Sequence, residues 1–190
     1  MEPTAIGRRI TAAIRHLEDF RQTREVGSLE SAMIEVMLAA DATAKKVVPG
    51  EKSNKKRMKK FFADYEWLIV GIGSDVAMSG YKSDGTTVPD VLYEHLRCAL
   101  IHEGEPSSDV EFVSDYWTQL GSNNMGWVLP ERYIDGIVAA VVVAPENAEE
   151  YAGEDLEINF HGGRFALLDR SWGELQGMIK VHNQHFHGIY

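Results

Sequence analysis

The sequence predicts a mainly α-helical fold, a single-domain helical bundle of about six helices with one or two short β-hairpins. Two observations support this fold class. Over most of the chain, apolar residues recur every three or four positions, which is the period of one helix face. The alternating pattern of a strand is clear only in EDLEINFHGGRFALL, residues 154–168. At 190 residues, the chain is long enough for one domain (1–190) with its own core.

Three helices are expected before the first long loop. The first spans residues 4–22, where isoleucine, alanine and leucine share one face. The second is expected from about 29 to 48, with Ser28 as its N-cap and Pro49–Gly50 as its end. The third is expected as one continuous helix from about 54 to 71.

A fourth helix is marked at both ends. It follows residues 71–89, whose Gly, Ser and Asp residues predict a loop with a turn around Asp84–Gly85. Thr87-Val-Pro-Asp90 has the form of a capping box, with the proline in the first turn. The helix is expected from about 88 to 103, since Gly104 is typical of a helix end.

The last third of the chain mixes strands and helices. Aromatic and β-branched residues followed by GSNNMG predict a short hairpin within 110–128, ending near Trp127. Pro130 opens a fifth helix to about residue 144. The strand pattern predicts an inserted β-hairpin at about 155–168, with two glycines at its turn. A final helix is expected from Ser171 to about Asn183.

Composition indicates a soluble cytoplasmic protein with no membrane partner. Apolar residues make up 44% of the chain and charged residues 25%. The N-terminal sequence lacks the basic and apolar regions of a secretory signal. The longest apolar run, residues 137–144, is far below the roughly 18 residues that a membrane span needs. The single cysteine, Cys98, cannot form an intrachain disulfide.

Charge is distributed unevenly along the chain. The net charge is −10, yet residues 45–60 contain eight basic residues and one acid, which leaves −17 on the rest. Such a basic segment can bind phosphates on an otherwise acidic protein. The expected RNA-binding side chains are Lys55, Lys56, Arg57, Lys59 and Lys60. The alternative is a solvated surface whose lysines serve solubility.

The fourth predicted helix carries a pair of residues suited to phosphate chemistry. Arg97 has a planar, permanently charged fork that matches a phosphate, and His102 can move a proton near neutral pH. Together they suit phosphodiester cleavage without a metal. The histidine would take a proton from the attacking hydroxyl, and the arginine would stabilise charge on the phosphoryl oxygens.

The stretch LYEHLRCALIHEGE, residues 92–105, resembles the HEPN group of helical proteins. Their signature is an arginine followed, after four to six residues, by a histidine near a helix end, and four residues separate Arg97 from His102. The preceding Tyr93 and the following Glu103 also look like those of several prokaryotic members, and we expect them to support the site.

The resemblance implies a function and partners. Many HEPN proteins are homodimeric, metal-independent ribonucleases of defence or toxin–antitoxin systems, with the arginine and histidine of two protomers facing each other at the interface. It therefore implies RNA or a nucleotide as ligand, an antitoxin protein as a further partner, and no cofactor. Arg97 would bind the scissile phosphate, and His102 would act as general base or acid.

Other interpretations stay open. Five residues turn an ideal α-helix through about 500°, so Arg97 and His102 would not share a face. Many active HEPN members have Asn, Asp or His after the arginine, where this chain has Cys98. A distorted helix end, the reach of the long arginine or a second protomer could bring the side chains of Arg97 and His102 together. Cys98 and the acidic body of the protein favour a non-catalytic helical module that binds a nucleotide or a protein. A further alternative is structural: Arg97 pairs with Glu94 or Glu103, and His102 caps the helix end.

Histidines gather near the C-terminus. His182, His185 and His187 lie within six positions, and His161 lies in the predicted hairpin. Zinc sites use such histidines, but no cysteine or carboxylate stands at a matching spacing. We expect no metal here, and His182 is assigned to the packing face of the last helix.

Overall fold

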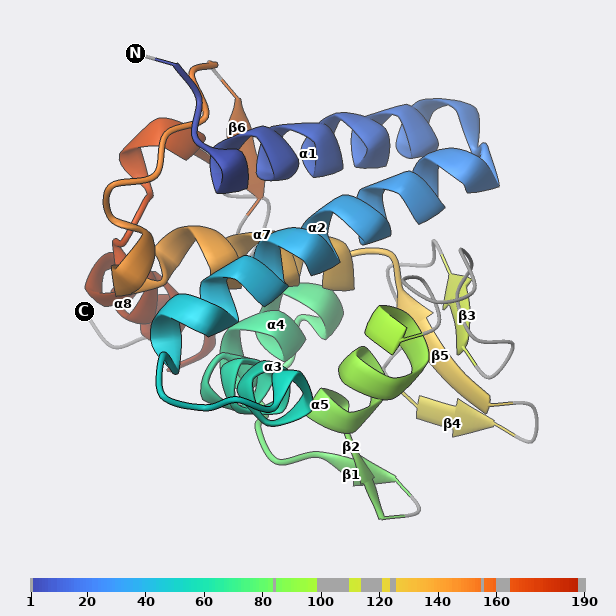
Figure 1. Ribbon diagram of the computed structural model, residues 1–190. Coiled ribbons are helices and arrows are strands. Elements are labelled where there is room, and N and C mark those ends of the chain that lie inside the picture. The colour runs from blue at the N-terminus through green and yellow to red at the C-terminus, as the bar shows by residue number, and fades with distance from the viewer. Residues whose placement is uncertain are drawn as a thin grey trace.

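The computed structural model describes residues 2–83, 85–98, 110–113, 121–123, 126–154, 156–159 and 165–187. Over these residues the protein is mainly helical, with a few short strands in small sheets, as the sequence predicts (Figure 1).

The first two helices form an antiparallel pair along the top of the molecule (Figure 1). Helix α1 (Ala5–Thr23) begins at Thr4, whose Oγ1 accepts the Gly7 N–H at 3.1 Å, and it agrees with the predicted first helix. It ends at Arg24, which has a left-handed backbone with φ of 62°. Helix α2 (Val26–Val47) follows almost at once.

The expected N-cap of α2 is wrong. The helix begins before Ser28, and Glu25 at its N-cap makes no side-chain capping bond. The Ser28 hydroxyl donates instead to the Asp19 carboxylate of α1. The tight turn after α1 therefore decides where α2 begins, and the serine ties the two helices together.

The predicted third helix is in fact two helices. Helix α3 (Asn54–Asp64) begins at the Ser53 cap, and helix α4 (Glu66–Ser74) follows after a break at Tyr65, where φ is −110° and ψ is 9°. The apolar periodicity runs across the break without an inserted loop, so it resembles one long helix. The break lets α4 pack against α7, described below, with nearly all of its residues buried.

The capping box predicted at Thr87 is confirmed. Strands β1 (Lys82–Ser83) and β2 (Thr86–Thr87) form a small hairpin beside Gly85, which has φ of 81°. Helix α5 (Val88–Val91) then starts with both reciprocal bonds between Thr87 and Asp90.

The fourth helix changes type after one turn. From Leu92 to Cys98 the backbone forms a π-helix, η1, whose hydrogen bonds connect residues five apart rather than four. The rest of the predicted helix, to residue 103, lies outside the described residues. In a π-helix, two side chains five positions apart point in more similar directions than they do in an α-helix. The change of helix type therefore affects the geometry around Arg97.

A small mixed sheet follows. Strand β5 (Gly126–Pro130) pairs antiparallel with β4 (Gly121–Asn123) and parallel with β3 (Val110–Val113), in the order β3-β5-β4. The strand at Val110 was predicted, but as one arm of a hairpin with GSNNMG as its turn. In the structure this strand, β3, pairs parallel with β5, and the hairpin is formed by β4, which lies within the predicted turn. Local turn residues reveal a hairpin, whereas parallel pairing depends on a longer connection.

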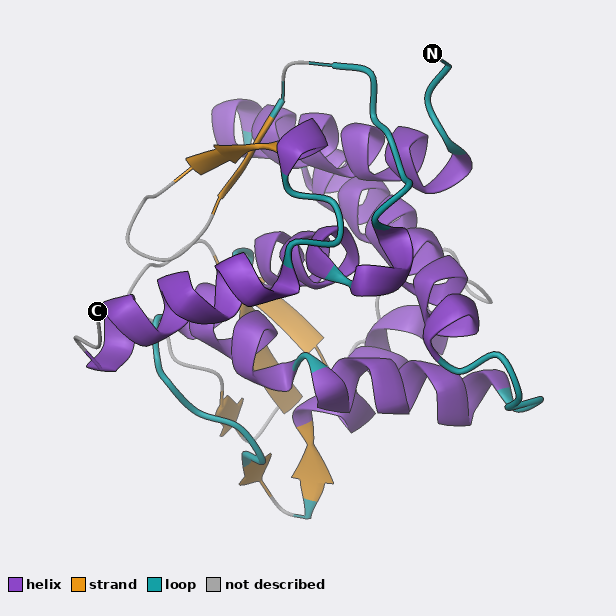
Figure 2. Ribbon diagram, turned by 90° about the vertical axis from the view of Figure 1, so that its left-hand side faces the viewer, coloured by secondary structure: helices purple, strands orange, loops and turns teal. Residues whose placement is uncertain are grey.

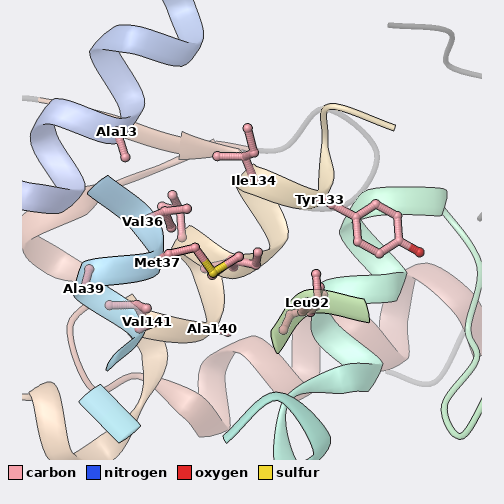
Figure 3. Packing of buried hydrophobic residues seen from close by; sticks show 14 of the residues in the cluster. Ala13, Val36, Met37, Ala39, Leu92, Tyr133, Ile134, Ala140 and Val141 are labelled. Carbon is pink, nitrogen blue, oxygen red and sulfur yellow. The ribbon is translucent and has the colours of Figure 1, made fainter. Parts of the chain in front are cut away.

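Helix α7 (Tyr133–Val143) is the buried centre of the fold, and it begins three residues after the predicted start. Figure 3 shows Val36 and Met37 of α2 beside Ile134, Ala140 and Val141 of α7. The helix lies so close to α4 that a Cβ on Gly136 would lie 2.7 Å from the Ile69 carbonyl oxygen.

The C-terminal elements close the fold. A short 3-10 turn (Pro145–Asn147) precedes β6 (Glu157–Asn159), which pairs with β7 (Phe165–Leu167) in the predicted hairpin. A second 3-10 turn (Leu168–Arg170) leads to α8 (Leu175–His187), which ends the described chain (Figure 2).

Helix α8 begins four residues after the predicted start. The backbone turns first at Gly173, where φ is 76°. The Gly173 N–H donates to the Val142 carbonyl at 2.8 Å, at the end of α7. This contact with the central helix delays the start of α8.

Candidate functional site

Arg97 lies in the π-helix η1, a kind of helix that is often found at functional sites. The guanidinium carbon of Arg97 is 5.9 Å from the centre of the Tyr93 ring. Its Nε is buried and makes no hydrogen bond to any residue that the structure describes. The arginine contacts an aromatic ring of its own helix, and a guanidinium has further N–H donors on its two terminal nitrogens.

The structure brings a predicted RNA-binding lysine to the same ring. Helix α3 packs beside η1 and α5, and Lys55 Nζ is 6.0 Å from the centre of the Tyr93 ring. Tyr93 itself is only 7% exposed. Arg97 and Tyr93 were predicted on one helix and Lys55 on another, and in the structure the three side chains meet at one place.

Acidic residues of α5 and η1 neutralise part of the basic segment. Lys55 pairs with Glu94 at 2.6 Å, and Lys59 pairs with Asp90 at 2.5 Å and with Glu94 at 3.2 Å. Hydrogen bonds from Lys55 and Lys59 lower the pKa of Glu94. Burial alone would raise the pKa of Asp90, but hydrogen bonds from Lys59 and Thr87 lower it to about 2.

The other three predicted RNA-binding residues differ in their partners. Lys60 pairs with Asp64 one turn along α3, at 2.8 Å. Arg57 donates to the Glu51 carbonyl at 2.7 Å and to Asn54 at 3.2 Å. Lys56 is exposed and forms no ion pair with any residue that the structure describes. Lys56 is thus the member of the set best placed to meet a phosphate.

The pairing of Glu94 bears on the alternative role of Arg97. If Arg97 were structural, Glu94 was expected as one of its partners, and this carboxylate binds Lys55 and Lys59 instead. His102 and Glu103, the other predicted members of the site, lie outside the described residues.

Cys98 contacts the same tyrosine. Tyr93 and Cys98 are five positions apart, the spacing that a π-helix aligns. Burial, and then the neighbouring Cys98 thiol, raise the pKa of the Tyr93 phenol. The thiol is half-buried and forms no disulfide. Cys98 therefore lies close to the ring that contacts Arg97.

Two of the C-terminal histidines contact aromatic and acidic side chains outside their own helix. His182 is 7% exposed and meets the Trp67 ring edge-on, with 4.7 Å between ring centres. His185 Nε2 lies 2.8 Å from Asp75. No group of three or more metal-ligating side chains occurs within the described part of the chain.

We expect His182 to make stability depend on pH. Burial, and then the charges of His187 and His185, lower its pKa to about 4, against about 6.5 for an exposed histidine. The unfolded chain therefore binds this proton more readily. Stability should be full above about pH 6.5 and fall by about 3 kcal/mol as the pH approaches 4. Urea denaturation at several pH values measures the loss.

The matched variant is His182→Leu, which keeps an apolar side chain against Trp67 and cannot take up the proton. Its stability should fall less over the same pH range. An identical pH dependence in both proteins would contradict the assignment to His182.

Sequence analysis missed a buried network of charges. Arg21 on α1 pairs with Glu131 at 3.1 Å and with Asp135 at 2.5 Å, and Arg24 approaches Glu131 at 3.3 Å. Both acids are 8% exposed. The sequence feature that could have indicated this network is the pair Glu131 and Asp135, two acids one helical turn apart at the start of a strongly apolar helix. The network joins α1 to the start of α7 and has a structural role.

Among the described residues, no helix combines the length and the apolar character that a membrane span requires.

Comparisons with known proteins give one match. No curated protein and no solved structure matches the chain. The model of the Rv1289 family matches residues 5–187, from the first helix to the end of the last. The chain therefore belongs to the Rv1289 family.

Proposed function

We propose that the protein is a metal-independent RNA endonuclease of the HEPN type, in which Arg97 stabilises the scissile phosphate and His102 is the general base or acid. The observation that carries the proposal is the meeting of Arg97 and Lys55 at the Tyr93 ring, on a π-helix. Two cations at one buried aromatic ring form a phosphate-binding surface beside the residue that the HEPN resemblance makes catalytic.

The chemistry follows from the residue types. The guanidinium of Arg97 offers donors to two phosphoryl oxygens and cannot lose its proton. Lys55 adds charge nearby, and exposed Lys56 extends the basic surface along α3. The 2′-hydroxyl attacks the phosphorus while His102 takes its proton. The bond from phosphorus to the 5′-oxygen breaks, and this oxygen leaves with a proton from water, which gives a 2′,3′-cyclic phosphate and a 5′-hydroxyl. In the proposal, two copies of the chain form a homodimer that pairs the arginines and histidines, and an antitoxin protein restrains the enzyme in the cytoplasm.

A second function has one observation in its favour. Cys98 occupies the position where many active HEPN enzymes carry a polar residue, and its thiol lies close to the Tyr93 phenol. A non-catalytic module would use the same cationic surface to hold a nucleotide or an acidic segment of another protein. It would bind RNA without cleaving it.

The test of catalysis uses end-labelled RNA with and without EDTA. We expect cleavage to survive EDTA, to leave 2′,3′-cyclic phosphate ends and to fall about 100-fold or more in Arg97→Ala and in His102→Ala. Lys180→Ala, an exposed lysine on α8, is the matched control and should cleave normally. Equal cleavage by all four proteins would rule out the proposed site. Binding without cleavage would select the second function.

Lys56→Ala tests the basic surface separately. Because Lys56 is exposed and outside the ion pairs of α3, the variant should fold normally. RNA affinity should fall a few-fold, and the slope of log K against log salt should become shallower by about 0.7 for one lost phosphate contact. Fluorescence anisotropy at several salt concentrations measures both quantities. An unchanged slope would exclude Lys56 from the RNA contact.

A further inference from the structure

A groove of about 430 Å³ runs along α1, away from the Arg97 surface. Helix α1 lies at the top of Figure 1, and α5, which leads into η1, lies in its lower half. Arg8, Thr11, Arg15 and His16 line the groove. They stand at positions i, i+3, i+7 and i+8 of one helix, so they share one face.

The cationic side chains of the groove are anchored by the protein. Arg8 Nη1 donates to the Pro3 carbonyl at 2.6 Å, and Arg15 Nη2 pairs with Glu154 at 2.5 Å. Each guanidinium keeps further N–H donors beyond these bonds. Two arginines and a histidine against one carboxylate give the groove an excess of donors and positive charge, on a protein whose net charge is −10.

A buried hydroxyl beneath the groove has no partner among the described residues. Thr11, which lines the groove, is 8% exposed, and its Oγ1 makes no hydrogen bond within the part of the chain that the structure describes. An unsatisfied buried hydroxyl is unfavourable, and structures usually avoid it. Rotation about the Cα–Cβ bond exchanges the hydroxyl and methyl of threonine, so a ligand oxygen between Arg8 and Arg15 would give this group an acceptor.

The remaining walls are apolar. Pro3, Ala12 and Ala152 line the groove together with the aliphatic stems of the arginines. Beside it lies a second hollow of about 270 Å³, which also uses Arg8 and Ala12. The combined space is larger than a bare phosphate ion needs.

We infer that this groove is a second binding site, for a small phosphate monoester with an apolar or planar body. The dianionic phosphate matches the two arginines that line the groove and the Thr11 hydroxyl, and the body covers the apolar wall. The inference is independent of RNA cleavage, because it uses no residue of the Arg97 surface.

Isothermal titration calorimetry with phenyl phosphate tests the site. All proteins carry Arg97→Ala, so the Arg97 surface does not contribute. We expect saturable binding that weakens about 10-fold or more in Arg8→Ala and in Arg15→Ala. Thr11→Val, nearly the same shape without the hydroxyl, should also bind more weakly. Unchanged affinity in both arginine variants, or no binding, would overturn the inference.

The Glu154→Gln variant is expected to bind phenyl phosphate more tightly, a result that misfolding would not produce. It removes the carboxylate that pairs with Arg15 and that would repel a phosphate, so affinity for phenyl phosphate should rise several-fold. Lys180→Ala should bind unchanged. Inorganic phosphate should bind more weakly because it lacks the body. Benzoate binding as tightly as phenyl phosphate would overturn the assignment of a phosphate group.

Discussion

Replacing Arg21 with methionine is expected to lower the free energy of unfolding by about 3–5 kcal/mol. Arg21 bridges two carboxylates, Glu131 and Asp135, that are each only 8% exposed. Burial already raises the pKa of Asp135, even though Arg21 acts in the opposite direction. Without the guanidinium, a buried carboxylate loses its partner at the start of the central helix.

Urea denaturation at neutral pH measures this effect, and Arg24→Met is the control. Arg24 reaches the same Glu131 at 3.3 Å but is 57% exposed, so its loss should change stability by less than about 1 kcal/mol. Adding Asp135→Asn to Arg21→Met should restore part of the stability, because the double variant no longer buries the unpaired carboxylate of Asp135. Equal losses in the two arginine variants would contradict the importance of burial.

The sign of the pH dependence gives a second check. Removing Arg21 raises the folded-state pKa of Asp135 further above its unfolded value. The folded state then favours the protonated acid. The loss of unfolding free energy caused by Arg21→Met should therefore be smallest at low pH and grow as the pH rises through the pKa of Asp135. A deficit that shrinks with rising pH would exclude this explanation.

Replacing Gly136 with alanine is expected to destabilise the protein by about 3 kcal/mol, the upper part of the range for overpacking. The added Cβ would lie 2.7 Å from the carbonyl oxygen of Ile69 and 2.9 Å from its Cα. These are backbone atoms of α4, which cannot rotate away, so α4 and α7 would have to separate. Thermal and urea denaturation both report the loss.

Gly177→Ala is the matched substitution without a clash. Gly177 lies on α8, and the nearest atom to its added Cβ is 3.9 Å away, on the Glu174 side chain. Alanine should stabilise this helix by about 0.5–1 kcal/mol, since glycine is the poorer helix former. Similar effects at Gly136 and Gly177 would mean that α4 and α7 are not in close contact.

The sequence predicted most elements because their signals are local. Apolar periodicity located the first helix, the Thr87 capping box located α5, and strand alternation located the β6–β7 hairpin. The break at Tyr65 escaped prediction because it adds no loop residues. The parallel pairing of β3 with β5 escaped because it depends on a connection that local turn residues do not specify.

The candidate site was predicted only in part, for the same reason. The motif identified Arg97 and Tyr93 on one helix, and charge counting identified Lys55 on another. Nothing in the sequence shows that α3 packs on η1, or that the helix changes from four-residue to five-residue hydrogen bonds at Leu92. The partners of Lys55 and Lys59 likewise depend on how two helices pack, which residue types alone do not reveal.

The central place of α7 has a consequence for synthesis on the ribosome. Helices α1 to α4 end at residue 74, whereas α7 begins at residue 133. At about 5–20 residues per second, several seconds pass before the nascent chain contains the helix that covers their apolar faces. During that interval the N-terminal helices would expose an apolar surface of the kind that chaperones bind. Truncation before residue 133 should accordingly yield an insoluble fragment.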